Sequence, residues 1–362
     1  MKNIHDKALK SFYKLKQFDT RDSPRLTMKL FDTLVLPIAS YACEVWCPFT
    51  TKNISKSDFM SVCDNIVMEK LNIKLCKYLL GVNRYSTNAA VKGELGRPPL
   101  MTKFLIHSIK YWFRLHNLNV EKSFAKQSYL DNLICSTKTN NFWSSAMYNI
   151  LNKFNLENTW DNQGETETSI NIINIKADIL NQYSSAWLNH ITRENVPNKL
   201  LNYSSFKTKF AMENYVLCLP VNKRKNFTKL RISSHPLEIE KGRYSRPKVP
   251  AENRLCKFCN SSIVETEKHF LLECTLYDKI RINLYDTLKV CSLIDTDNHD
   301  ETYLSLMGYL QGDTEIAEIV CHHIDACFSL RQEVYDLISS QNDKFIPFAL
   351  EFIRLASIHE NL

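Results

Sequence analysis

The chain has 362 residues, 44% of them hydrophobic, only 7 glycines and a net charge of +7 at pH 7. The length exceeds one typical domain, and the hydrophobic content is sufficient for buried cores. Few glycines favour helices over hairpin-rich folds, and the absence of G-x-x-x-x-G-K-[ST] and G-x-G-x-x-G motifs excludes phosphate-loop chemistry. We therefore expect a mainly α, multi-segment helical protein.

Charge is distributed unevenly along the chain. The net charge is +10 for residues 1–120, zero for 121–222, +8 for 223–260 and −11 for 261–362. A basic front and a second basic stretch are typical of a protein with a nucleic-acid partner. A solvated basic surface, paired internally with the acidic tail, would leave the same pattern.

The sequence contains no recognisable export or membrane signal. The N-terminal stretch MKNIHDKALKSFYK lacks the apolar core of a secretion signal. The most apolar stretch, residues 33–49, is too short to span a bilayer and contains Pro37 and Glu44. We expect an intracellular protein, nuclear or cytoplasmic, that is neither secreted nor membrane-spanning. Its 12 cysteines should then be mostly reduced, so a Cys/His cluster indicates metal binding.

The first 120 residues predict three helices. Ser23 and Pro24 are typical of a helix start, and Pro37 bends or ends that helix. A second helix is expected over 57–80, with Ser57 or Asp58 as its cap and Gly81 just past its end. A third is expected over about 101–118, with Leu105, Ile109, Trp112 and Phe113 as its apolar stripe.

The rest of the chain alternates between helical and irregular patterns. Residues 159–169 resemble a linker, and isoleucine and aromatic residues then recur at helical spacing from 172 to 191. Four prolines and Gly242 in 220–255 favour short strands or extended loop there. Helices are expected again from 276 onward. The domain ranges we expect are 1–120, 121–222, 223–290 and 291–362.

The strongest motif is RLCKFCNSSIVETEKHFLLEC, residues 254–274. It places Cys256, Cys259, His269 and Cys274 at the spacing C-x2-C-x9-H-x4-C. Three thiolates and an imidazole complete a tetrahedral zinc shell and leave no open position, which indicates a structural ion. Five residues along a regular helix turn through about 140°, so the helix must loosen or end before Cys274. The alternative is a core histidine beside unrelated cysteines.

Other cysteines are better explained as core residues. CHHIDAC places His323 and Cys327 four residues apart on an expected helix, where a second metal site competes with ordinary burial. Cys43 and Cys47 flank Trp46 and are also expected in the core. His235 and Glu240 suggest an acid–base pair only weakly, because no nucleophile or open metal site is near in sequence.

Several stretches, taken in order, resemble the reverse transcriptases of non-LTR (LINE-type) retrotransposons. LFDTLVLPIASYACEVW (30–46), KLCKYLLGVNRYSTNAAVKGELGRPPL (74–100) and YWFRL (111–115) are similar to the region after the catalytic palm. FKTKFAMENYVL (206–217), FTKLRISSHPLEIEKGRY (227–244) and the cysteine stretch are similar to the C-terminal part. The resemblance is weakest in 121–180 and after about 290.

The resemblance implies a helical thumb and linker, followed by a basic segment and a zinc knuckle that hold template RNA and target DNA. The four Cys/His residues match the knuckle ligands. Arg231, His235, Glu240, Gly242 and Arg243 match the segment before it. Ala42 replaces a common glycine, and Thr275 stands where proline often follows the last cysteine.

The chemistry of that family is missing from this chain. Its polymerases hold two Mg²⁺ ions on paired aspartates, usually in Tyr-x-Asp-Asp, and no Asp-Asp pair occurs here. The family's N-terminal endonuclease also has no counterpart. We therefore expect no catalytic residue, no Mg²⁺ site and no small-molecule substrate.

The function expected from these observations is nucleic-acid binding by a chain that lacks the palm and the endonuclease. The cofactor expected is structural Zn²⁺. The alternative is a zinc-stabilised helical module that binds a protein. Oligomeric state and the choice of RNA or DNA have no sequence signal. The candidate phosphate-binding residues are Lys223, Arg224, Lys225, Lys229, Arg231, His235, Arg243, Arg246 and Lys248, and Phe227, Tyr244 and Phe258 are candidates for stacking on bases.

Overall fold

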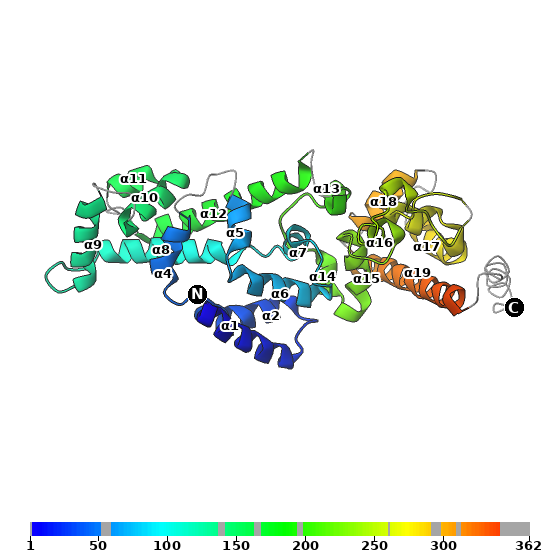
Figure 1. The fold of residues 1–362 in the computed structure, drawn as a ribbon, viewed down its shortest axis with the longest axis horizontal. Coiled ribbons are helices and arrows are strands. Elements are labelled where there is room, and N and C mark those ends of the chain that lie inside the picture. Colours follow the sequence, from blue (N-terminus) through cyan, green and yellow to red (C-terminus); the bar gives the residue numbers. More distant parts are fainter. Residues whose placement is uncertain are drawn as a thin grey trace. The chain divides into compact units, whose positions relative to one another are not determined.

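Helices make up most of the part that the computed structural model describes (Figure 1). The described residues are 2–51, 59–136, 142–162, 168–193, 198–259, 261–290, 298–308 and 313–340. Within them there is no β-strand, and one isolated antiparallel bridge joins Leu255 to Val264. None of their helices combines the length and the apolar character needed to cross a membrane. The expected mainly α fold is confirmed.

The chain forms two compact units, each assembled from segments that are distant in sequence. The first contains residues 1–76, 95–196 and 209–211, and the second contains 77–94, 197–208 and 212–362. The four ranges expected from the sequence, 1–120, 121–222, 223–290 and 291–362, stay a prediction.

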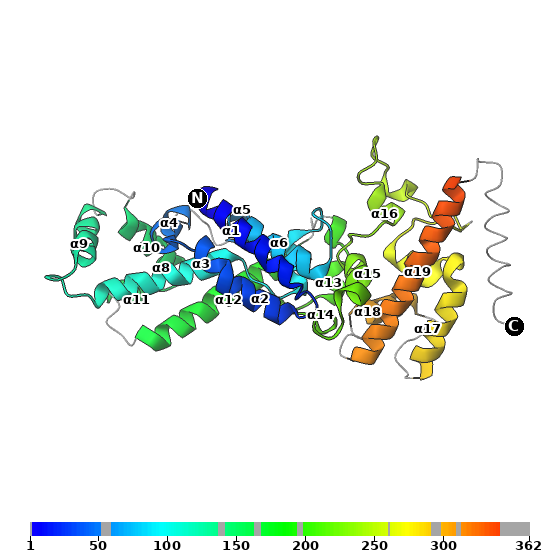
Figure 2. The same ribbon diagram turned by 90° about the horizontal axis from the view of Figure 1, so that it is seen from below.

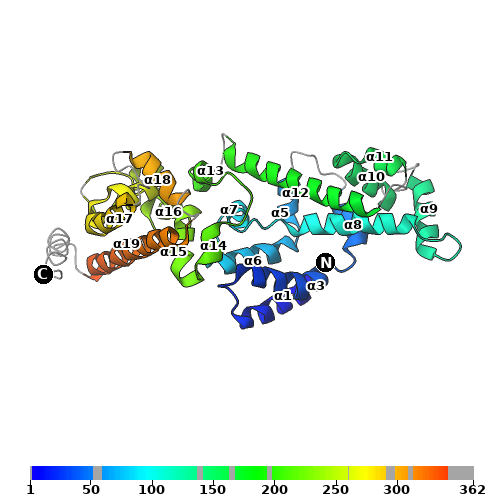
Figure 3. The ribbon, with the colours of Figure 1, turned by 180° about the vertical axis from the view of Figure 1, so that it is seen from behind.

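In the first unit, several helices pack on α8 (Leu100–His116). Helices α4 and α12 both contact it (Figures 1 and 3). The expected stripe on α8 is confirmed, since Leu105, Ile109, Trp112 and Phe113 are buried. Along α12, the isoleucine and aromatic stripe from 175 to 191 is buried as well. The helices of this unit are α1 (Lys2–Leu15), α2 (Pro24–Leu34), α3 (Leu36–Ala39), α4 (Cys43–Thr51), α5 (Phe59–Asn65), α6 (Glu69–Leu80, which ends in the second unit), α8 (Leu100–His116), α9 (Phe124–Ser136), α10 (Trp143–Lys153), α11 (Glu157–Asp161) and α12 (Thr168–Thr192), with a 3₁₀ turn η1 (Lys16–Phe18).

Helix α2 begins at Pro24, as predicted, but the helix expected over 57–80 is two helices, α5 and α6. The break lies at 66–68. Immediately after it, the buried carboxylate of Glu69 accepts a hydrogen bond from the backbone N–H of Leu100 at 2.7 Å, a tertiary contact that no local pattern encodes. Ser57 and Asp58 lie outside the described residues. Gly81 has φ +66° and ends α6, as predicted.

In the second unit, α15 and α17 both pack on the long helix α19 (Figure 2). Helix α15 corrects the expectation of strands or loop for 220–255. Pro220 lies at its N-cap and the next proline is Pro236, so the 11 residues of the helix contain none. The helices of this unit are α7 (Asn88–Glu94), α13 (Tyr203–Phe206), α14 (Asn214–Cys218), α15 (Val221–Arg231), α16 (Glu238–Lys241), α17 (Asp278–Val290), α18 (His299–Met307) and α19 (Thr314–Ser340), with 3₁₀ turns η2 (Asn198–Leu200), η3 (Ala251–Asn253) and η5 (Thr275–Tyr277) and a π-helical turn η4 (His269–Glu273).

Candidate metal centre and basic arm

A short hairpin presents the first two cysteines of the cluster. The backbone N–H of Cys256 donates to Ile263 O at 2.8 Å, and Glu265 N–H donates to Arg254 O at 3.0 Å. Cys259 lies in the loop that follows Cys256. The loop closes through Ser262, whose φ is +51°. The C-x2-C spacing therefore places both thiols at the tip of one hairpin.

A capped helical turn presents the other two ligands. The hydroxyl of Thr266 accepts a hydrogen bond from the backbone N–H of His269 at 3.1 Å, which is the geometry of a helix N-cap. From His269 the helix continues as a π-turn, in which Cys274 N–H donates to His269 O at 2.8 Å. This wider i→i+5 turn brings His269 and Cys274 to the same side. The loosening expected before Cys274 is confirmed.

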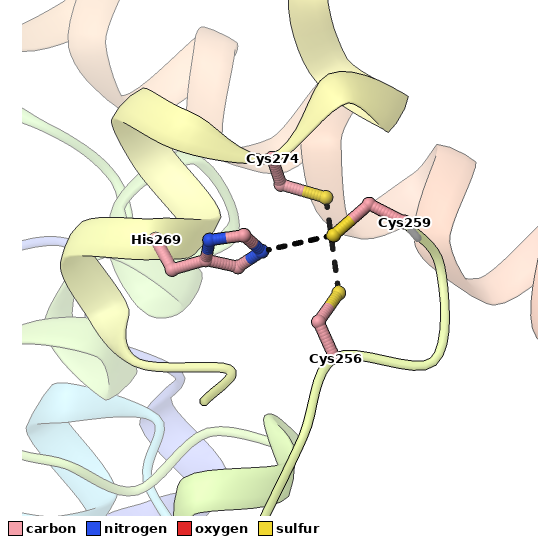
Figure 4. Close-up of side chains that lie close together, drawn as sticks. All are labelled: Cys256, Cys259, His269 and Cys274. Carbon is pink, nitrogen blue, oxygen red and sulfur yellow. Dashed lines mark hydrogen bonds between the residues drawn. The ribbon is translucent and has the colours of Figure 1, made fainter. Parts of the chain in front are cut away.

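The four side chains converge on one point (Figure 4). Their ligand atoms, three Sγ and one imidazole nitrogen, all lie within 4.8 Å of one another. Cys256 Sγ is 3.8 Å from Cys274 Sγ, and Cys259 Sγ is 3.4 Å from His269 Nε2. Cys256, His269 and Cys274 are buried, and Cys259 is half-buried. This group could hold one metal ion, and among the described residues no other set of three or more Cys, His, Asp or Glu side chains has such geometry.

The electrostatics of the cluster favour a thiolate. A hydrogen bond from Cys274 lowers the pKa of Cys256 to about 4, although burial opposes this shift. The same hydrogen bond raises the pKa of Cys274. Burial lowers the pKa of His269, but the Cys256 contact outweighs it and the net shift is upward. His269 Nδ1, the ring nitrogen that faces away from the cluster, lies 3.4 Å from Glu273 Oε2. A carboxylate beside the second ring nitrogen is usual for metal-bound histidine.

Two arginines fasten this cluster to the helices around it. Arg331 of α19 donates two hydrogen bonds, at 2.9 and 2.8 Å, to the buried carboxylate of Glu265, and its guanidinium lies 4.6 Å from the centre of the Phe258 ring. Arg281 of α17 donates to Leu271 O, within the π-turn, and to Cys274 O, just after it. Local sequence patterns carry no signal for either arginine, because each acts on a different structural element.

A third arginine connects the hairpin to the preceding segment. Arg254 donates to Ile239 O at 2.7 Å and to Val249 O at 3.0 Å, so it holds both ends of residues 239–249. We call residues 239–249 the arm loop. Gly242 lies against this arginine, and an added Cβ there would be 2.7 Å from Arg254 Cδ. The metal hairpin and the arm loop thus form one packed piece.

Three of the residues that the sequence predicts to contact phosphate are buried in the structure. Arg224 is buried and donates to Leu219 O and Leu79 O. Arg231 is buried against Glu94 and Glu213, at 3.0 to 3.1 Å. His235 is buried and lies 2.8 Å from Glu267. A buried side chain with partners inside the protein has no face left for phosphate, so these three side chains stabilise the fold.

The remaining predicted cations lie at the surface to different degrees. Lys223, Lys225, Arg246 and Lys248 are exposed, whereas Lys229 and Arg243 are half-buried. Helix α19 covers part of this surface: Glu318 pairs with Lys223, and Asp325 accepts a hydrogen bond from Asn226. The charge pattern suggests that the acidic tail pairs with the basic stretch. On α15 the structure shows such a pairing, between Lys223 and Glu318. Of the residues proposed to stack, Phe227 and Phe258 are buried, and only Tyr244 is exposed.

The cysteines that the sequence predicts to be core residues are buried. Cys43 and Cys47 are buried, as predicted. On α19, His323 Nε2 is 3.6 Å from Cys327 Sγ and both are buried, but they form no cluster of three potential ligands among the described residues. The interpretation as core residues therefore fits this helix better than a second metal site.

No family model, curated protein or solved structure matches this chain.

Proposed function

We propose that this chain binds RNA or DNA through the arm loop, and that a structural zinc ion at the Cys/His cluster keeps the loop in place. The observation that carries the proposal is the Arg254 clamp. It joins the start of the metal hairpin to both ends of the loop that bears Arg246 and Lys248. Three thiolates and one imidazole suit Zn²⁺ in a closed structural site. Such an ion supplies folding free energy on the order of 10 kcal/mol.

The exposed cations set the expected strength of the phosphate contacts. Lys225, Lys241, Arg246 and Lys248 are exposed, and within the described part of the chain only Lys241 has a carboxylate at ion-pair distance, Glu238 at 3.9 Å. If about four single-strand phosphates are contacted, affinity falls by about 50-fold between 50 and 200 mM salt. This role corresponds to that of the nucleic-acid-holding C-terminal part of a non-LTR retrotransposon reverse transcriptase.

The test is fluorescence anisotropy of a labelled structured RNA and a labelled single-stranded DNA at several salt concentrations. Cys256→Ser/Cys259→Ser should lose zinc and bind more weakly. The matched control is Cys135→Ser/Cys218→Ser, which changes two exposed cysteines outside the cluster and should retain both properties. Zinc content is measured for every protein by mass spectrometry.

A second comparison locates the binding surface. Arg246→Ala/Lys248→Ala should lower the salt slope by about 1.4, since each phosphate that is no longer neutralised accounts for roughly 0.7. Lys10→Ala/Lys14→Ala removes the same charge from exposed positions on α1 and should leave the slope unchanged. An equal decrease in both variants would contradict a role for the arm loop. If no nucleic acid binds at low salt with zinc present, the alternative gains support, namely a zinc-stabilised module that binds a protein.

A further inference from the structure

A cavity of about 450 Å³ lies beside the arm loop in the second unit. Three segments line it: residues 83–85 after α6, Lys199 of η2, and residues 234–244 around α16. Its volume falls within the usual range for a small-ligand site. No sequence pattern indicates this cavity, because Tyr85, Lys199 and Tyr244 are far apart along the chain.

Two aromatic side chains at the cavity are largely exposed. Tyr85 is 62% exposed and Tyr244 is 59% exposed. Each has a cation beside its ring: the Arg84 guanidinium lies 4.6 Å from the centre of the Tyr85 ring, and Lys199 Nζ lies 5.1 Å from that of Tyr244. Exposed tyrosines accompanied by cations are typical of surfaces on which unpaired bases stack.

A buried acceptor lines the same cavity. Glu240 is 5% exposed, and one of its oxygens pairs with Lys199. The other, Oε2, lies 3.0 Å from Arg243 Nε but receives no hydrogen bond from any described residue. Buried polar atoms normally have a hydrogen-bond partner, so Oε2 has acceptor capacity beyond its ion pair with Arg243. Ser234 and His235, in contrast, have protein partners, Ser86 and Glu267, both at 2.8 Å.

We propose that this cavity takes one unpaired nucleotide of a bound strand. The base stacks on Tyr85 and Tyr244 and donates a ring or exocyclic N–H to Glu240, while Lys199 and Lys241 face its phosphate. This inference rests on the proposed nucleic-acid binding and deepens it. The arm loop supplies sequence-independent phosphate contacts, and the cavity adds a contact that requires a base.

The experiment compares two probes of equal length and charge, a labelled single-stranded DNA and its counterpart with abasic sites at every position. Wild-type protein should bind the base-containing strand more tightly. The variants are Tyr85→Leu, Tyr244→Leu and the double variant, with Tyr41→Leu as the control because Tyr41 is 70% exposed in the first unit. Each tyrosine removed should weaken binding of the base-containing strand by roughly five-fold or more, since base–aromatic stacking is worth about 1–3 kcal/mol. Binding of the abasic strand should not change.

The two proposals fail in different ways. Equal affinity for both strands in wild type, or tyrosine variants that bind like wild type, would overturn the cavity proposal and leave phosphate binding by the arm loop intact. If neither strand binds at low salt, the proposed function and the cavity proposal both fall. Because the substituted side chains are exposed, circular dichroism should show unchanged folding in every variant.

Discussion

Replacing Arg231 by methionine distinguishes the role expected from the sequence from the role found in the structure. Nε and Nη2 of Arg231 donate to the two carboxylate oxygens of Glu94, each at 3.0 Å, and Nη2 also donates to Glu213 at 3.1 Å. The side chains of Arg231 and Glu94 are both fully buried. The rings of Phe206, Tyr215 and Phe227 surround the guanidinium.

The free-energy cost follows from these interactions. Arg231→Met leaves the Glu94 carboxylate buried without its cation, and breaking such a pair costs about 3–5 kcal/mol. That corresponds to a decrease of more than roughly 100-fold in the folding equilibrium constant. Burial raises the pKa of Glu94, but Arg231 outweighs burial and the net shift is downward. Without Arg231 the pKa should rise, so the destabilisation should shrink as the pH falls and Glu94 becomes protonated.

Urea denaturation followed by circular dichroism measures the effect. Arg231→Met/Glu94→Gln should recover part of the lost free energy of unfolding, because the uncompensated charge is gone. Lys248→Met, at an exposed position of the arm loop, should change stability by less than about 0.5 kcal/mol and weaken nucleic-acid binding instead. The reasoning is refuted if Arg231→Met costs less than about 1 kcal/mol and lowers nucleic-acid affinity as Lys248→Met does.

Three further predictions concern the metal, the Arg254 clamp and a buried histidine. A zinc chelator should lower the melting temperature of wild type, and it should have no effect on Cys256→Ser/Cys259→Ser; equal melting curves for wild type with and without chelator would argue against a structural ion. Gly242→Ala should displace the Arg254 side chain, cost about 1–3 kcal/mol in urea denaturation and weaken binding, while mass spectrometry finds zinc retained. Burial, aided by Arg281, lowers the pKa of His323 to about 4. Between about pH 6.5 and 4, His323 is therefore protonated in the unfolded chain but neutral in the folded protein. The free energy of unfolding should fall by about 3 kcal/mol as the pH drops through that range. His323→Leu should lack this part of the pH dependence in urea titrations, and parallel curves for the two proteins would disprove it.

The sequence determined the features that depend on short spacings. The set Cys256, Cys259, His269 and Cys274 was recognisable because its spacing suits a metal shell, and the structure brings their ligand atoms within 4.8 Å. The need for a loosened turn before Cys274 followed from helix geometry alone. The start of α2 at Pro24 and the left-handed Gly81 followed from backbone restrictions that act within a few residues.

Only the tertiary structure decided which charged residues face solvent. Arg231 and Arg246 belong to the same basic stretch, but Arg231 is buried because it pairs with Glu94. That partner lies 137 residues earlier in the chain. The Arg254 clamp, the Arg331–Glu265 pair and the cavity between Tyr85 and Tyr244 also join distant segments. Local periodicity reports which face of a helix is apolar. It carries no information about which distant carboxylate will compensate a cation, and burial of charge depends on that partner.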